Sequence, residues 1–224
     1  KGTLLVDPVK KFVEEMTLSA KTLWEQGETV FSLAPLSRVK LIQVPALVYA
    51  VAQCPLLSRL EWLNLRDAKL GLKRLKTFLK SPWLGGLTGI DFSYNGLSAS
   101  GLREIIACES LRQVKLLGLD NCGVTGDGLY LLLEPELLNG VEELHLRSNG
   151  LRPADAQGLA ESSALGSLRT LILEHNSQMG QDGLAAILGS PHLSSLRELS
   201  LRDCYLRNEG MGAFHAANPS LKLA

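Results

Sequence analysis

The chain has 224 residues, of which 46% are hydrophobic and 21% are charged. This composition is typical of a folded protein with a substantial core. Lysine plus arginine and aspartate plus glutamate both number 23, so the formal net charge is zero, which disfavours nucleic-acid binding. The longest apolar runs, such as 46–52, are too short to span a bilayer, and no signal peptide is recognisable. The sequence therefore predicts no membrane association.

The cysteines show no metal-ligand spacing. Cys54, Cys108, Cys122 and Cys204 form no C-x-x-C pair, so we expect structural thiols without metal, cofactor or disulfide. Free thiols indicate a reducing compartment, and the predicted location is the cytoplasm.

The sequence predicts that residues 1–35 form an N-terminal capping unit. Residues 1–11 contain Gly2 and Pro8 and should lead into the fold. We expect a first strand over Val13–Leu18 and a helix over Ala20–Leu33. Such a unit would cover the open end of a stacked core.

Residues 36–206 carry a repeated pattern. Its best copy is 141–151, which reads V-x-x-L-x-L-x-x-N-x-L. First pattern positions fall at 60, 87, 114, 141, 168 and 196, spaced by 27, 27, 27, 27 and 28 residues, and weaker copies begin at 13 and 36. Leu144 and Leu146 are two residues apart and so face one side of a strand. The amide of Asn149 should bond to backbone groups in the following turn, and one copy cannot bury its own leucines, so copies must stack.

The pattern resembles the leucine-rich repeat family, in its ribonuclease-inhibitor-like subtype. The helix opening Gly126-Asp127-Gly128-Leu129 is similar to the subtype's, and Ser81-Pro82-Trp83-Leu84 resembles bacterial arrays. The resemblance implies an α/β horseshoe of about eight repeats, with a parallel sheet on the concave face and helices on the convex face. The family is mostly scaffolds, inhibitors and sensors.

The C-terminal residues 207–224 are less regular. We expect a last helix over Asn208–Ala217, after which 219–223 begins another unit. Because no polar capping unit follows residues 219–223, we expect either a continuation of the array or self-association at the edge of this last strand.

Parallel strands lie about 4.8 Å apart, whereas helix axes need about 8–10 Å. The solenoid should therefore curve, and the alternate strand residues should form a concave binding surface. In one column of that surface Asp120, Arg147, Glu174 and Arg202 alternate in sign. Neighbours of opposite charge should pair, which describes either a self-neutralised ladder or a charged recognition strip.

Trp62 and Tyr94 are the aromatic residues of this surface, and Trp62 is expected to face solvent as a contact residue. The alternative is that Trp62 covers the space beside Gly89 or packs under a loop. Arg38, Lys40 and Arg66 flank it, so this end should favour an anionic or carboxylate-bearing surface. The predicted partner-binding set consists of Arg38, Lys40, Trp62, Asn64, Arg66, Asp91, Tyr94, Asp120, His145, Arg147, Glu174, His175 and Arg202.

Catalysis is not expected. His145 and His175 should lie about 10 Å apart, too far to share a metal. No serine or cysteine is in line with Asp120 and His145. The sequence predicts a non-catalytic module that binds another protein on its concave face. The alternatives are an enzyme regulator of the GTPase-activating or inhibitor type and, less favoured, a nucleic-acid binder.

Overall fold

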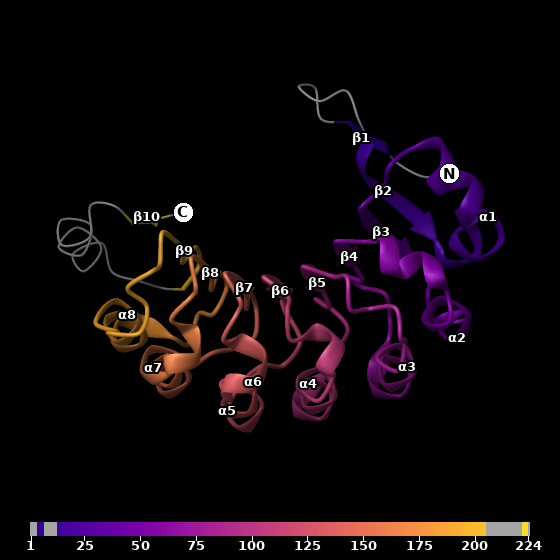
Figure 1. Cartoon of the computed structure of the whole chain (residues 1–224). Helices are drawn as coiled ribbons and strands as arrows, with labels where there is room; N and C mark the ends of the chain where they lie inside the picture. Colours follow the sequence, from indigo (N-terminus) through magenta and orange to yellow (C-terminus); the bar gives the residue numbers. More distant parts are fainter. Residues whose placement is uncertain (1–3, 7–12, 205–220, 224) are drawn as a thin grey trace.

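The computed structural model describes residues 4–6, 13–204 and 221–223. Its strands form a ten-stranded sheet in chain order from β1 to β10. Figure 1 shows the strands on the inside of an arc and the helices on the outside. The predicted α/β solenoid, curved with its sheet on the concave side, is confirmed.

The strands are short and evenly registered. Their bounds are β1 (Leu4–Val6), β2 (Val13–Ser19), β3 (Arg38–Ile42), β4 (Trp62–Asn64), β5 (Gly89–Asp91), β6 (Leu116–Gly118), β7 (Glu143–His145), β8 (Thr170–Ile172), β9 (Glu198–Ser200) and β10 (Lys222–Leu223). From β2 to β10 all neighbours are parallel. The register aligns Leu117 with Leu144 and Leu144 with Leu171, one sequence period apart.

The connecting segments return along the convex side. The helices are α1 (Ala20–Leu33), α2 (Val48–Ala52), α3 (Gly71–Phe78), α4 (Ser98–Ile106), α5 (Asp127–Leu132), α6 (Pro135–Leu138), α7 (Pro153–Glu161) and α8 (Gly180–Leu188), with 3-10 turns η1 (Pro55–Arg59), η2 (Glu109–Leu111) and η3 (Ser163–Leu165). Pro153 begins α7, where its missing N–H costs nothing.

The core is the row of inward leucines between the sheet and the helices. Leu63, Leu117, Leu144, Leu146 and Leu171 are all fully buried. This confirms the inward assignment made from the two-residue spacing.

The asparagines of the pattern join neighbouring repeats. Asn176 Nδ2 donates to Leu146 O at 3.0 Å in the preceding repeat and to Leu173 O at 2.6 Å in its own. Its Oδ1 accepts from Asn149 N at 3.0 Å and Leu151 N at 3.1 Å. The amide therefore satisfies backbone groups of two repeats at once, beyond the local role predicted from sequence.

Cysteine replaces asparagine twice. Cys122 Sγ donates to Phe92 O at 3.4 Å, and Cys204 Sγ donates to Leu173 O at 3.2 Å. Burial raises the pKa of Cys122 to about 12, so this thiol stays protonated and remains a donor. The predicted weak donor role is confirmed.

Both ends differ in detail from the sequence prediction. The first strand extends to Ser19 and the helix over Ala20–Leu33 is confirmed. The prediction missed β1, which pairs antiparallel with β2. At the other end β10 continues the sheet beside β9, as the partial repeat suggested, while the predicted Asn208–Ala217 helix lies outside the described residues.

At one position of the repeat, shortly after the strand, the backbone is left-handed. Its φ lies between 48° and 61° in seven repeats, at Gln43, Asp67, Tyr94, Asn121, Ser148, His175 and Asp203. At this point the chain leaves the sheet and turns toward the convex side. Only in the first unit does the equivalent residue, Ala20, begin a helix directly. This conformation is not predicted from the sequence, because non-glycine residues rarely adopt it.

Candidate functional site: the concave face

Trp62 does not face solvent. It is only 9% exposed, so the expected open orientation is wrong. A Cβ added at Gly89 would lie 2.4 Å from Trp62 Cε3, so the indole fills the space that this glycine leaves free. The alternative weighed from sequence, that Trp62 covers the gap beside Gly89, is confirmed. The guanidinium of Arg38 lies over the ring, 5.2 Å from its centroid.

Arg66 sits at the centre of a charge cluster. Its Nη1 donates to Asp120 Oδ2 at 2.9 Å, lies 3.8 Å from Asp91 Oδ2, and its Cζ is 4.3 Å from the centroid of Tyr94. Burial acts to lower the pKa of Arg66, but the hydrogen bond to Asp120 and the nearby carboxylates outweigh it and raise the pKa. The structure thus brings Arg66, Asp91, Tyr94 and Asp120 together.

The two carboxylates of this cluster are also held by backbone groups. Asp91 and Asp120 are 6% and 4% exposed. Asp91 Oδ1 accepts from Ser93 N at 2.8 Å, and its side chain lies where a Cβ on Gly118 would stand. Asp120 Oδ1 accepts from Arg147 N at 2.9 Å. Both carboxylates are therefore committed to contacts inside the repeat array.

A second cluster surrounds Glu174. Its carboxylate pairs with Arg147 and with Arg202, the latter at 3.0 Å, and accepts from Ser200 Oγ at 2.6 Å. Burial acts to raise the pKa of Glu174, but the hydrogen bonds from Ser200 and Arg202 and the two arginine charges lower it. The predicted alternating ladder is confirmed here, although Asp120 reaches Arg147 through the backbone N–H.

The two predicted histidines each have their own carboxylate partner. His145 Nε2 lies 2.7 Å from Glu143 Oε1, and His175 Nδ1 lies 3.1 Å from Asp203 Oδ2. Burial acts to lower the pKa of His145, but the bond to Glu143 and the charges of Glu143 and Asp120 raise it. Among the described residues, no three His, Cys, Asp or Glu side chains converge as metal ligands would.

The remaining predicted residues lie at the N-terminal end of the face. Arg38 and Lys40 project from β3, whose inward residues are Val39 and Leu41. Asn64 is the lateral neighbour of Lys40 on β4. Ile42, on the same face, is 36% exposed and was not predicted as a site residue.

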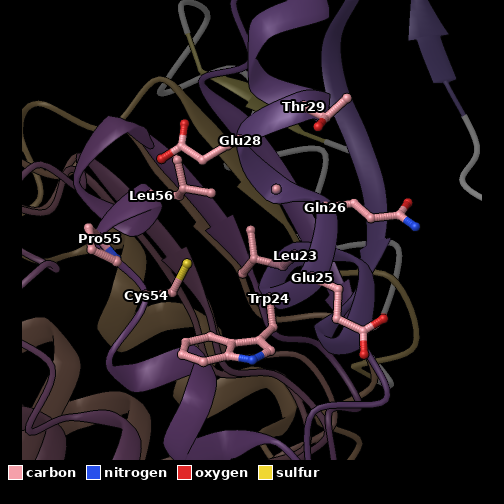
Figure 2. A pocket seen from close by; sticks show the side chains of 10 residues that line it. Leu23, Trp24, Glu25, Gln26, Glu28, Thr29, Cys54, Pro55 and Leu56 are labelled. Atoms are coloured by element: carbon pink, nitrogen blue, oxygen red, sulfur yellow. The ribbon is translucent and has the colours of Figure 1, made fainter.

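Two hollows lie away from the sheet surface. One of about 180 Å³ lies between α1 and the turn into η1, and in Figure 2 the indole of Trp24 closes one side of it, across from Glu28 and Thr29. Glu25 and Glu28 on its rim already face Lys21 and Arg59 at 3.9 and 3.7 Å. The other, about 340 Å³, is lined by Tyr94, Gly96, Ser98, Asn121, Cys122 and Gly123 at the left-handed turns.

The repeat geometry agrees with the comparison to protein families. A family model described as leucine rich repeat matches residues 192–214. The fold is a leucine-rich repeat solenoid. No curated protein matches the chain.

Among solved structures, one similar chain belongs to the crystal structure of the Rad7 and Elc1 complex in yeast. The TM-score is 0.46 and the identity 14%, and the match covers 81% of this chain and 61% of that chain. This chain therefore spans less than two thirds of that protein's length, and likeness at this level supports no inference about function.

Among the described residues, no helix is long and apolar enough to cross a membrane.

Proposed function

We propose that this leucine-rich repeat protein is a non-catalytic binding module that holds another protein on its concave face. The observation that carries the proposal is the continuous sheet, which presents accessible concave-face side chains beside the buried core. Val39 and Leu41 are fully buried, while Arg38, Lys40 and Ile42 on the opposite face stay accessible. A rigid, polar, curved surface of this kind is suited to binding a large partner.

The chemistry of the face supports binding rather than turnover. His145 is paired with Glu143. The buried carboxylates Asp91, Asp120 and Glu174 are each bound by an arginine or by backbone N–H groups. These groups hold each other in place, whereas a general base must reach a substrate proton.

We further assign the array to the ribonuclease-inhibitor-like subtype and the protein to the cytoplasm. The 27-residue spacing and the α-helices on the convex side support the first assignment. The second is supported by four free cysteines that are all buried as thiols.

The partner surface is tested with paired charge reversals. Arg38→Glu with Lys40→Glu alters the concave face, and Lys73→Glu with Arg103→Glu makes the same charge change on α3 and α4. Each immobilised variant is used to capture proteins from a cell lysate, which are identified by mass spectrometry. We expect the concave pair to lose proteins that the wild type and the convex pair retain. Loss with the convex pair alone would overturn the proposed surface.

We also propose that the array associates edge to edge at β10. This strand pairs with β9 on one side, and among the described residues no strand pairs with its other side. Exposed strand edges are sites of association. Light scattering over a range of concentrations should show a dimer that Leu223→Pro removes. A monomer at all concentrations would contradict this.

A further inference from the structure

We propose that Arg38, Lys40 and Asn64 form a carboxylate-binding site for an acidic segment of the partner protein. This inference rests on the proposed concave-face function and names the chemistry of the partner at one end of that face. It is carried by a difference between Arg38 and Arg66, which both stack on an aromatic ring but differ in the acceptors within reach.

Arg38 and Arg66 both stack on an aromatic ring of the next repeat. Arg38 lies 5.2 Å from the centroid of Trp62, and Arg66 lies 4.3 Å from that of Tyr94. A ring under the guanidinium fixes its plane and leaves the N–H groups at its edge to bind other groups. Stacking therefore prepares both side chains in the same way.

Their in-plane N–H groups meet different surroundings. Arg66 donates to Asp120 at 2.9 Å and has Asp91 beside it. Arg38 has only Glu15, at 3.7 Å from its Nε, which is too long for a hydrogen bond. Within the part of the chain whose side chains are described, Arg38 thus keeps its donors available for a ligand.

Lys40 lies two residues from Arg38 on the same face of β3, and the described residues give its ammonium no ion pair or hydrogen bond. Asn64 is next to it on β4. Asn64 Oδ1 accepts from Arg66 N at 2.9 Å, which commits the oxygen and leaves the Nδ2 donor without a described partner. Guanidinium, ammonium and amide N–H groups therefore lie in adjacent strands, and among the described residues Glu15 is the single acceptor paired with them, beyond hydrogen-bond distance.

The charge of this patch suits a carboxylate. Two cations are partly offset by Glu15, so the excess is close to one positive charge, which matches a carboxylate better than a dianionic phosphate. Asp91 follows Asn64 in the same row but its Oδ1 is bound to Ser93 N. Ile42 adds an exposed apolar contact beside the charged groups.

The test uses a capped glutamate–glycine peptide, its glutamine–glycine counterpart and inorganic phosphate as probes. NMR signals of the Arg38 side chain and the Trp62 indole N–H are followed in the whole protein during each titration. We expect saturable shifts with the glutamate peptide and none with the glutamine peptide. Equal binding of both peptides, or stronger binding of phosphate, would overturn the carboxylate assignment.

Variants locate the site. Lys40→Gln and Arg38→Gln should each weaken glutamate-peptide binding by about tenfold, whereas Lys73→Gln on α3 should not change it. Lys40→Gln leaves the Arg38–Trp62 stack in place, so it tests the site even if Arg38→Gln disturbs folding. If Lys40→Gln binds like the wild type, the assignment is wrong. If the concave face captures its partner yet no acidic peptide binds, this inference fails while the proposed function stands.

Discussion

The two ends of the concave face handle charge in opposite ways. Around Glu174 one carboxylate pairs closely with two arginines and accepts a hydrogen bond from Ser200, so the charged groups are held by one another. Around Arg38 and Lys40 the described residues supply one paired carboxylate, that of Glu15, at 3.7 Å from Arg38 Nε and beyond hydrogen-bond distance. We call the set Arg147, Glu174 and Arg202 the closed strip, and the set Arg38, Lys40 and Asn64 the open strip. A protein with zero formal net charge can thus carry both on a single sheet. Local pairing, and not overall charge, decides where such a surface can bind.

The largest expected effects test whether the two strips share one core. Leu63 and Leu144 lie beneath the open and the closed strip, and both are fully buried. Leu63→Ala and Leu144→Ala should each lower the free energy of unfolding by about 2–5 kcal/mol, since each leaves a core cavity. Urea denaturation measures both. A much smaller loss at one position would show that the core is not uniform under the two strips.

A methyl group at Gly89 should disturb the open strip alone. The added Cβ would lie 2.4 Å from Trp62 Cε3, so the indole and the stacked Arg38 must move. Gly89→Ala should cost about 1–3 kcal/mol by overpacking and shift the Arg38 side-chain NMR signals. Gly85→Ala is the control, because a Cβ there meets nothing within 4 Å. Similar melting curves for both variants would contradict the close packing of Trp62.

Acid should weaken the closed strip first. Because the pKa of Glu174 is lowered in the folded state, its contribution is present above the unfolded pKa and is lost as the pH falls through the folded pKa. The wild type should therefore lose stability in acid more steeply than Glu174→Gln. Thermal melting of both proteins as the pH is lowered through the acidic range makes the comparison. Parallel curves would mean that Glu174 gains nothing from its arginines.

The smallest effect is expected at His145, between the two strips. Its raised folded pKa means that its stabilising contribution is complete below the unfolded pKa and lost as the pH rises through the folded pKa. NMR titration of the imidazole should show a pKa above the ordinary value, which Glu143→Gln lowers. An unchanged titration in that variant would assign the shift to other neighbours, such as Asp120.

The periodicity made most of the fold predictable. A strict spacing of inward leucines fixes the strand register and the burial of residues such as Leu117 and Leu171. The charge ladder followed because residues one period apart become neighbours. The antiparallel β1 and the seven left-handed turns were not predictable, since neither repeats a hydrophobic pattern.

The site was predicted less well than the fold. Alternation places Trp62 on the concave side but does not show that its ring folds over a neighbouring glycine. Gly89 and Gly118 in adjacent repeats were the available signal, because a missing side chain leaves room for a large neighbour. The open donors of Arg38 and Lys40 depend on which carboxylates lie within reach, and this requires three-dimensional positions.

The amides of Asn95, Asn149 and Asn176 bond their repeats to the preceding ones, so unfolding one of these units removes hydrogen bonds from its neighbour. At Cys122 and Cys204 a thiol makes a single longer bond to the preceding repeat, at 3.4 and 3.2 Å. These two junctions should therefore be weaker than those that Asn149 and Asn176 make with two or more bonds to the preceding repeat. Under heat or load we expect these two boundaries to open before the boundaries at Asn149 and Asn176.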